Sequence, residues 1–461
     1  MVFVPKTLSM KSLSILGSTG SIGRQTLSVV DSLPGQFKIV ALAAGSNLEE
    51  LVSQVERHRP ELVSVAYQKL ADEVSRRLRE KGITPLPAIH HGREGMLAVG
   101  THPQTDIVVS AAVGIVGLEA TYEAVKLGRT IALSNKEVLV AAGELVMAAA
   151  TKSGRELLPV DSEHNAVHQC LRAGRRSSSR EGPGGPGSGV APGVLGFTST
   201  EPTTTGTGGR TFRSDIDLSA KVGGLAPEEL LYPEVRRIIL TASGGPFRKT
   251  LLKALATVTI DQALAHPNWR MGNRITIDSA TMMNKGFEII EARWLFGVRP
   301  DQIDVLIHPQ STIHSMVEFV DCSVLAQLGP TDMRMPIQYA LTYPERVASN
   351  QVALDWSKLK RLDFEKASTR RFPCLRLARE AMKKGGALPC ALNAADEIAV
   401  AAFLEKRLPF LGIPEVIERV LSRTPGVKFA SMDDVLSADA DARRQAHEEV
   451  ARYATACAAA L

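Results

Sequence analysis

The sequence predicts an α/β protein with three parts: an N-terminal Rossmann-like doubly wound sheet, a central α/β domain and a C-terminal helical domain. Three observations predict this fold. Short β-branched runs alternate with longer helical patterns from residue 12 to about residue 160. A second strand-like run begins at residue 235, and the end of the chain is alanine-rich with helical periodicity. We therefore place domains at 12–160 and 161–342, a linker at 343–369 and the helical domain at 370–461.

The N-terminal part is expected to contain parallel strands joined by crossover helices. Apolar and charged residues recur at helical spacing in Asn47–His58 and Lys69–Lys81. The candidate strands are Ser12–Leu16, Phe37–Ala43, Leu62–Ala66, Ile107–Ser110, Thr130–Ala132 and Glu156–Val160. This alternation is typical of a doubly wound α/β domain.

Composition changes sharply between Ser177 and Gly209, where glycine, serine, proline and threonine dominate. Such a segment cannot bury enough apolar surface to offset the entropy lost on ordering it. We therefore expect a mobile, low-complexity insertion on the surface at residues 175–225. Order should return with the strand-like run Val235–Ala242, which ends at Ser243-Gly244-Gly245-Pro246, a strand-to-loop boundary.

The remainder of the chain is expected to be mixed α/β up to about residue 343 and helical after the linker. Helical periodicity is clearest in Cys374–Lys383, Asn393–Glu405 and Ile413–Ser422. Alanine, the strongest helix former, is frequent in these segments.

Composition excludes several classes of protein. The chain has 54 Lys and Arg against 49 Asp and Glu, and an excess of 5 over 461 residues predicts neither nucleic-acid nor membrane partners. The longest apolar stretch, Ile107–Leu118, is far shorter than the roughly 20 residues that span a bilayer. The five cysteines are scattered without a CxxC pair, so we expect structural thiols in a reducing compartment; they are Cys170, Cys322, Cys374, Cys390 and Cys457. A small anionic substrate remains possible.

The first motif is Gly17-Ser-Thr-Gly20-Ser-Ile-Gly23, which follows a predicted strand and begins a helix. Glycines permit the tight turn and the close approach of a pyrophosphate, and the helix N-terminus supplies N–H donors. Sites for NAD usually carry an acidic residue about 20 positions further on. This chain has Ala43-Ala-Gly45-Ser46-Asn47 there, so the sequence favours NADP(H), with Arg24 as a further candidate for the 2′-phosphate.

The second motif predicts a metal site. Asp161 and Glu163 follow a short predicted strand, and residues i and i+2 of a strand point to one face. Further along, 281–291 is expected to be one helix in which Glu288 and Glu291 share a face. Ligands that are all oxygen atoms select Mg²⁺ or Mn²⁺ over zinc. We expect the adjacent His164 to be structural rather than a ligand.

Other polar residues are of the kind that holds a phosphate monoester or covers a site. Ser243, Ser279, Asn284 and Lys285 offer hydroxyl, amide and ammonium donors.

Lys136, in Ser134-Asn135-Lys136-Glu137, follows a predicted strand at the edge where such sheets bind ligands, although a surface lysine is the alternative. The segment 266–272 has the composition of a closing lid, with a plain helix-to-strand loop as the alternative. His308 and His314 lie in an apolar stretch, so we expect packed core histidines rather than metal ligands.

Several long stretches resemble the 1-deoxy-D-xylulose 5-phosphate reductoisomerase family. The match covers roughly residues 12–174 and 226–461. The matching stretches are Gly17-Ser-Thr-Gly-Ser-Ile-Gly, Ala132-Leu-Ser-Asn-Lys-Glu, Pro159-Val-Asp-Ser-Glu-His, Leu240-Thr-Ala-Ser-Gly-Gly-Pro-Phe, His266-Pro-Asn-Trp, Ile277-Asp-Ser-Ala-Thr-Met-Met-Asn-Lys-Gly-Phe-Glu and Ala391-Leu-Asn-Ala-Ala-Asp-Glu. Their common order along the chain makes this resemblance far more specific than a single glycine motif.

The resemblance implies a set of site residues, with 161–342 as the catalytic and metal-binding domain. NADPH would contact Thr19, Gly20, Ser21, Ile22, Gly45, Ser46, Asn47, Asn135, Glu137 and Gly272. Asp161, Glu163 and Glu288 would hold Mg²⁺ or Mn²⁺. The phosphorylated sugar substrate would contact Lys136, Ser162, Glu163, Ser243, His266, Ser279, Asn284, Lys285 and Glu288, with Ser243, Ser279, Asn284 and Lys285 around its phosphate. Lys136, Glu163 and His266 would be the catalytic residues.

The resemblance also implies a reaction, a homodimer and a location. The enzyme would rearrange 1-deoxy-D-xylulose 5-phosphate and reduce the product with NADPH to 2-C-methyl-D-erythritol 4-phosphate, the committed step of the non-mevalonate isoprenoid pathway. The chain departs from the family at two positions: some members have lysine in place of Ser46, and many have proline in place of Thr331. The insertion is absent from compact bacterial members, which suggests a plastid-type organelle, either apicoplast or chloroplast stroma, with bacterial cytoplasm as the alternative.

Two other functions are compatible with the first motif. An NADP-dependent dehydrogenase of another small substrate, such as a semialdehyde or homoserine, would use the same first domain without needing three metal-binding carboxylates. A dinucleotide-sensing or scaffolding protein would bind NADPH without turnover. Dependence of turnover on a metal discriminates among these three functions.

Overall fold

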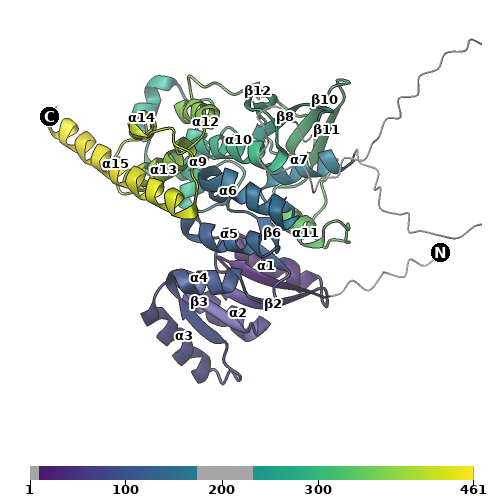
Figure 1. Cartoon of the computed structure of the whole chain (residues 1–461). Coiled ribbons are helices and arrows are strands. Elements are labelled where there is room, and N and C mark those ends of the chain that lie inside the picture. The colour runs from purple at the N-terminus through teal and green to yellow at the C-terminus, as the bar shows by residue number, and fades with distance from the viewer. Residues whose placement is uncertain (1–9, 174–231, 460–461) are drawn as a thin grey trace, which may run out of the picture.

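The computed structural model describes residues 10–173 and 232–459, and its N-terminal part is a seven-stranded parallel sheet (Figure 1). The strand order is β4-β3-β2-β1-β5-β6-β7. The strands are β1 (Lys11–Leu16), β2 (Phe37–Ala43), β3 (Leu62–Val65), β4 (Ala88–His91), β5 (Ile107–Ser110), β6 (Thr130–Leu133) and β7 (Leu157–Pro159). The connecting helices are α1 (Ser21–Ser32), α2 (Leu48–His58), α3 (Gln68–Glu80), α4 (Gly92–Gly100), η1 (Gly114–Gly117), α5 (Leu118–Lys126) and α6 (Glu137–Ser153).

Both faces of this sheet are buried, because alternate residues of each strand point to opposite sides. Leu42 packs with α1 and α2 on one face, and its neighbours Ala41 and Ala43 pack on the other with α4, α5 and α6. The strands consequently read as continuous apolar runs, which is why most of them are predictable from the sequence.

The second sheet has five strands in the order β11-β10-β8-β9-β12, in which only β8 and β9 are parallel. Its strands are β8 (Val235–Ala242), β9 (Ile303–Ile307), β10 (Ile313–Phe319), β11 (Val324–Leu328) and β12 (Glu365–Lys366). The helices of this region are α7 (Ser162–Ala173), η3 (Leu252–Thr257), α8 (Ile260–Leu264), α9 (Asn273–Thr281), α10 (Met283–Phe296), η4 (Pro300–Gln302) and α11 (Arg334–Thr342). The insertion expected at 175–225 lies outside the described residues.

The C-terminal part is helical and shares a core with the second sheet. Its helices are α12 (Pro373–Lys384), α13 (Leu388–Leu404), α14 (Gly412–Arg423) and α15 (Met432–Ala459). Ile289 and Ile290 of α10 belong to the same buried cluster as Leu375 and Ala378 of α12. In contrast, Ile337 and Leu341 of α11 pack into the core of the N-terminal sheet. The chain therefore returns to its first sheet before it enters the C-terminal helices.

Most of the predicted strands and helices are confirmed in type. The edge strand β4 was not predicted, because Ala88–His91 is largely exposed and includes two histidines. The loop at 266–272 joins α8 to α9, so the alternative of a helix-to-strand loop was wrong, because a helix follows it. Cys170, Cys374 and Cys390 are buried as expected, whereas Cys322 is exposed on the turn after β10. No helix in the described part of the chain is long and apolar enough to cross a membrane.

Candidate functional site

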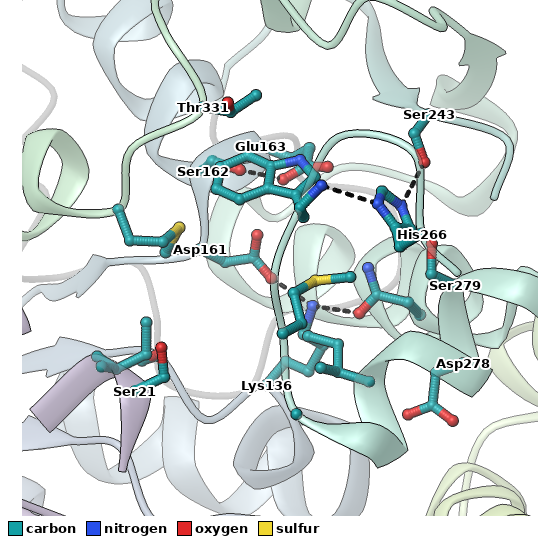
Figure 2. Close-up of a pocket in the computed structure, with 18 of the residues that line it drawn as sticks. Ser21, Lys136, Asp161, Ser162, Glu163, Ser243, His266, Asp278, Ser279 and Thr331 are labelled. Atoms are coloured by element: carbon teal, nitrogen blue, oxygen red, sulfur yellow. Dashed lines mark hydrogen bonds and ion pairs between the residues drawn. The ribbon is translucent and has the colours of Figure 1, made fainter. Parts of the chain in front are cut away.

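A cavity of about 1110 Å³ lies between the N-terminal sheet and the second sheet (Figure 2). It opens where β6 and β7 end, which is the edge where parallel sheets bind ligands. Fifteen site residues named from the sequence line it: Gly20, Ser21, Ile22, Asn135, Lys136, Glu137, Asp161, Ser162, Glu163, Ser243, His266, Gly272, Ser279, Asn284 and Lys285. Ser134, from the same motif as Lys136, lines it as well. Residues from six separate stretches of the chain thus meet in one cavity.

Asp161, Glu163 and Glu288 converge as predicted, although the argument from a strand was wrong. Strand β7 ends at Pro159, and Glu163 lies in the first turn of α7. The backbone N–H of Asn165 donates to the carbonyl oxygen of Asp161 over 2.8 Å, which marks the beginning of that helix. One carboxylate oxygen from each of the three acids lies within 4.8 Å of the others.

The third acid lies beneath the cavity, and the helix expected at 281–291 that carries it is broken. Met282, with φ +64, separates α9 from α10 in the left-handed region of the backbone. Glu288 and Lys285 therefore project from a new helix, α10, one turn after its start. Glu288 is fully buried.

Two lysines hold these carboxylates together. Lys136 Nζ donates to Asp161 (Figure 2) and to Asn284 Oδ1, 2.8 Å away. It also lies 3.4 Å from Glu288 Oε1. Lys285 Nζ lies 2.7 Å from Glu163 Oε1 and also bonds to Glu288. Three carboxyl groups face two ammonium groups, so a divalent cation would find oxygen ligands here and, once Glu288 is ionised, excess negative charge.

The pKa values reflect this crowding of charges. Burial, together with the charge of Glu163, raises the pKa of Glu288 to about 8. Burial alone would raise the pKa of Asp161, but the charge of Lys136 outweighs it and the pKa lies below its usual value. Burial opposes the charged form of Lys285, yet Glu163 and Glu288 raise its pKa above the usual value.

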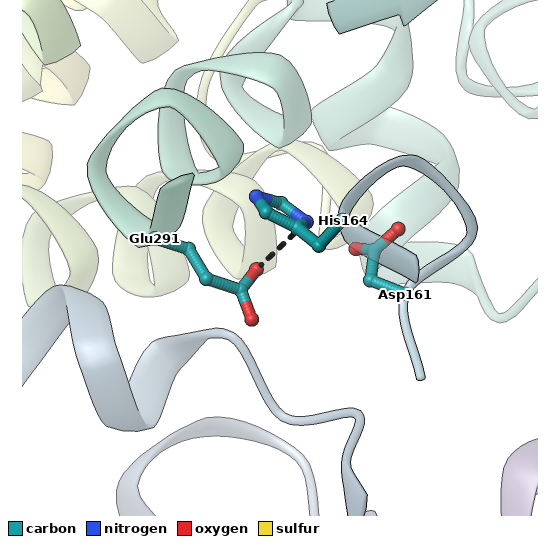
Figure 3. Close-up of side chains that lie close together, drawn as sticks. All are labelled: Asp161, His164 and Glu291. Carbon is teal, nitrogen blue, oxygen red and sulfur yellow. Dashed lines mark ion pairs between the residues drawn. The ribbon is translucent and has the colours of Figure 1, made fainter. Parts of the chain in front are cut away.

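His164 and Glu291 form a second buried pair behind these carboxylates (Figure 3). His164 Nε2 donates to the backbone carbonyl of Glu288 over 2.9 Å, and its Nδ1 lies 3.3 Å from Glu291 Oε2. Burial lowers the pKa of His164 to about 4 and raises that of Glu291 well above its usual value. His164 is thus a neutral ring bonded to the backbone of α10, consistent with the structural role expected for it, although one of its ring nitrogens also lies within 4.8 Å of a carboxylate oxygen of Asp161.

Two of the four residues expected around a phosphate, Ser243 and Ser279, meet at another wall of the cavity. The other two, Asn284 and Lys285, lie beside the carboxylates. Gly245 has φ +63, and a Cβ there would lie 2.6 Å from the carbonyl oxygen of Ser279. The glycine turn after β8 can therefore lie against α9, which brings Ser243 and Ser279 to the same wall. His266 joins them, because its Nε2 donates to Ser243 Oγ over 2.9 Å.

The loop 266–272 is anchored at one end. Nδ1 of His266 accepts from the backbone N–H of Asn268 and Trp269, at 3.2 and 3.0 Å, which leaves the proton on Nε2. Asn268 Nδ2 donates to the carbonyl oxygen of Pro309 over 2.6 Å. The beginning of the loop is therefore fixed to the second sheet, and Trp269 and Gly272 extend along the cavity.

The glycine motif forms a tight turn between β1 and α1. Gly17, with φ +88, donates its N–H to the carbonyl oxygen of Ala43 over 2.9 Å. Gly20 is the N-cap residue of α1, and it has no side chain that could accept from the N–H groups of the first turn. These N–H groups are therefore free to bind an anion. Gly23 packs against the backbone of Gly17 and Ser18.

Five of the residues named from the sequence do not line the cavity. Glu288 is buried beneath it, and Thr19 lies in the glycine turn. Gly45, Ser46 and Asn47 are exposed after β2, beside that turn. The side chain of Asn47 caps α2 by accepting from the N–H of Glu50 over 3.2 Å. These residues lie along the same sheet edge outside the cavity.

Comparisons with known proteins agree with this geometry. A family model described as 1-deoxy-D-xylulose 5-phosphate reductoisomerase matches residues 13–143, the C-terminal domain model of the same description matches 225–296, and a DXP reductoisomerase C-terminal domain model matches 328–445. A relative of that name from Solibacter usitatus is 45% identical over 441 residues, which are 95% of this chain and 97% of the relative. Another from Pelotomaculum thermopropionicum is 44% identical over 434 residues, covering 94% and 97%.

The chain belongs to the 1-deoxy-D-xylulose 5-phosphate reductoisomerase family.

Solved structures of reductoisomerases have the same fold. The enzyme from Zymomonas mobilis in complex with NADPH is 37% identical, covers 96% of this chain and 99% of its own, and gives a TM-score of 0.77. A reductoisomerase in complex with NADPH, fosmidomycin and magnesium is 34% identical, covers 96% and 98%, and gives a TM-score of 0.79. The expected fold class is therefore confirmed for this member of the reductoisomerase family.

The reductoisomerase cavity also contains residues that the sequence did not indicate. His314 lines it while being buried, so the expectation of a packed core histidine was incomplete. Arg274 and Ser311 line it as well. None of the three belongs to a motif with recognisable spacing. The one available signal was the position of Arg274, two residues after Gly272.

Proposed function

We propose that this chain converts 1-deoxy-D-xylulose 5-phosphate into 2-C-methyl-D-erythritol 4-phosphate, using NADPH and Mg²⁺ or Mn²⁺, as in the committed step of the non-mevalonate isoprenoid pathway. The observation that carries the proposal is the convergence of Asp161 and Glu163, which line a cavity beside the glycine turn, with Glu288, which is buried beneath it. Membership of the reductoisomerase family supports it, as do relatives solved with NADPH and with magnesium.

We assign the metal to Asp161, Glu163 and Glu288. Their oxygen atoms suit a hard divalent cation, and the excess of carboxylates over ammonium groups favours its binding. When bound, such a cation supplies Lewis acidity toward the carbonyl and hydroxyl oxygens of the substrate. Ser162 Oγ donates to Glu163 Oε2 over 2.6 Å and so orients one of the three ligands.

We assign NADPH to the sheet edge that leads into the cavity. The N–H groups before α1 suit its pyrophosphate, and the absence of a carboxylate after β2 suits a 2′-phosphate. Bound NADPH would supply the hydride. The contacts assigned are Thr19, Gly20, Ser21, Ile22, Gly45, Ser46, Asn47, Asn135, Glu137 and Gly272.

We assign the substrate to the space between the carboxylates and the turn after β8. Ser243, Ser279, Asn284 and Lys285 would hold its phosphate through hydroxyl, amide and ammonium donors. The remaining contacts assigned are Lys136, Ser162, Glu163, His266 and Glu288.

Lys136, Glu163 and His266 are the residues we propose to act in catalysis. Lys136 bonds to Asp161, and burial alone would lower its pKa, but the carboxylates around it raise the pKa, so it acts as a fixed positive charge. His266 reaches Ser243 Oγ with its Nε2 proton, and its loop would exclude water when substrate is bound.

The two alternatives are not favoured. A dehydrogenase of another small substrate, or a silent NADPH-binding protein, has no need of three converging carboxylates held by two lysines. The test is the rate of NADPH oxidation with 1-deoxy-D-xylulose 5-phosphate, measured with added Mn²⁺ and with a chelator. Oxidation that requires the metal is expected, and oxidation unaffected by the chelator would overturn the proposal.

We also propose a homodimer formed through the second sheet. Strand β11 is at the edge of that sheet among the described strands, and Val320, Val324 and Leu325 are exposed there. An edge of this kind tends to pair with another chain. Analytical ultracentrifugation of the parent and of Val324→Lys tests this: the parent is expected to be a dimer and the variant to dissociate more readily.

Domain limits and location are proposals that rest on the sequence. We retain 12–160, 161–342 and 370–461 as functional units joined by the linker 343–369. A plastid-type organelle is proposed because of the insertion at 175–225, with bacterial cytoplasm as the alternative, which the bacterial sources of the relatives favour. Immunolocalisation in the source organism decides between them.

A further inference from the structure

Arg274, at the beginning of α9, lies where three parts of the chain meet. Its Nη1 is 3.3 Å from Glu137 Oε1 at the start of α6 and 3.4 Å from Glu397 Oε2 on α13. Its Nη2 donates to Asn393 Oδ1, also on α13, over 3.0 Å. One guanidinium group therefore links a cavity residue to the C-terminal helices.

These contacts continue into the last helix of the protein. Arg443 on α15 donates from Nη2 to Glu397 Oε2 over 2.8 Å and from Nε to Asp439 Oδ2 over 2.6 Å. Acidic and basic groups thus alternate from the cavity to α15. Because the side chain of Arg274 is only 17% exposed and that of Glu137 only 15%, their interaction is weakly screened by water. Removing one member leaves a partly buried charge without its partner.

Arg274 and Glu397 also support the loop that forms a second wall of the cavity. Gly114 has φ +66, and a Cβ there would lie 3.1 Å from Glu397 Oε2 and 3.5 Å from Nη1 of Arg274. The carbonyl oxygen of Gly114 accepts from Asn135 Nδ2 over 2.8 Å. The loop after β5 therefore rests on the Arg274–Glu397 pair and in turn holds Asn135.

We propose that Arg274 is a positioning residue, through which Glu397 and the C-terminal helices hold Asn135 and Glu137 in place for NADPH. The inference rests on the proposed function, which assigns both residues to the cofactor. Glu397 does not line the cavity, so it can affect NADPH only through its neighbours. The C-terminal helices would then set cofactor affinity without touching the cofactor.

The test compares Glu397→Gln with Glu448→Gln in the full chain. Glu448 is a matched control because it forms an exposed ion pair with Arg444 on α15, remote from Arg274. NADPH affinity is measured directly by fluorescence titration, and kcat, the KM values and the thermal midpoint are measured alongside. Glu397→Gln is expected to raise the Kd and KM for NADPH about 5- to 50-fold, with kcat at saturating NADPH nearly unchanged. Glu448→Gln is expected to behave like the parent.

A double-mutant cycle separates this role from a direct one. If Arg274 acts through the pair, Arg274→Met combined with Glu397→Gln should weaken NADPH binding no more than Arg274→Met alone. Arg443→Lys keeps the positive charge but loses the two-pronged donor geometry of the guanidinium group, so it should weaken NADPH binding less than Glu397→Gln does. It replaces Glu397→Gln in the test if that variant does not fold.

The outcomes that overturn the proposal are distinct. A Glu397→Gln variant with parental NADPH affinity, even at a lowered thermal midpoint, overturns this inference alone. A parent chain that binds no NADPH overturns the proposed function together with it.

Discussion

Lys136 Nζ lies 3.4 Å from Glu288 Oε1, linking two side chains that are 152 positions apart in the sequence. Lys285 bonds to the other carboxylate oxygen of Glu288. A fully buried carboxyl group is thus held between two cations, which offset only part of the cost of burying its charge, since its pKa is still raised. The arrangement fixes the direction of Glu288 relative to Asp161 and Glu163.

The first prediction concerns the removal of this charge. Glu288→Gln keeps the shape of the side chain but removes a metal ligand and leaves two lysines facing a neutral amide. We expect turnover to fall by about 100-fold or more, because the Lewis acidity of a metal is worth several kcal/mol. NADPH affinity should be nearly unchanged, and Mn²⁺ binding measured by calorimetry should weaken.

Glu318→Gln is the control for that prediction. Glu318 is a buried acid of the second sheet paired with Arg236 and Arg237, and it does not line the cavity. Its loss should leave Mn²⁺ affinity at the parental level. Unchanged turnover of Glu288→Gln at saturating metal would remove Glu288 from the assigned ligands.

The second prediction concerns the glycine turn. A Cβ at Gly23 would overlap the carbonyl oxygens of Gly17 and Ser18, which are backbone atoms that cannot move aside cheaply. We expect Gly23→Ala to lower the thermal midpoint by about 5 °C or more. At Gly45, a Cβ would meet nothing within 4 Å, so Gly45→Ala should leave the midpoint unchanged. Equal midpoints for both variants would show that the turn can widen.

The third prediction concerns the segment rich in glycine, serine and threonine. Helix α7 ends at Ala173 and β8 begins at Val235, and both elements pack against other described residues of the core. Deletion of Ser177–Gly209 is therefore expected to leave turnover and solubility close to those of the parent. An insoluble or inactive product would show that the segment is part of the folded structure.

Much of the fold could be predicted because the strands of the first sheet are buried on both faces and their apolar runs are continuous. The glycine turn was equally predictable, since Gly17 and Gly23 are required by close backbone contacts. The edge strand β4 has no such run, because its residues face solvent. β4 is the edge strand next to β3, and its pairing is made by backbone hydrogen bonds rather than by an apolar side-chain pattern that the sequence would reveal.

The site was predicted in its residues but only partly in its geometry. The helix that begins at Ser162 could have been recognised from Ala166, Val167, Cys170 and Leu171, which recur at helical spacing and are buried. The break at Met282 carries no glycine or proline, so only tertiary packing reveals it. The contact between Arg274 and Glu397 joins residues 123 positions apart, which periodicity in one sequence does not detect.

The last prediction concerns pH and the buried acids Asp278 and Asp396, which lie at the contact between α9 and α13. Burial raises the pKa of Asp278 to about 6 and that of Asp396 well above its usual value, where the charge of Asp278 adds to the effect. The native protein therefore keeps protons that the unfolded chain releases above pH 4. Stability that depends on these protons is present at low pH and is lost as the pH rises through the raised pKa values.

Asp396→Asn replaces the proton by a permanent amide donor and should remove this loss. We expect the variant to be more stable than the parent at pH 8, by on the order of 1 kcal/mol, with the difference shrinking toward pH 4. Denaturant unfolding at a series of pH values measures it. Asp441→Asn, at an exposed position on α15, is the control and should show no such trend. A difference that is independent of pH would mean that Asp396 is ionised in the native protein, because only a group that binds its proton differently in the two states can produce a slope.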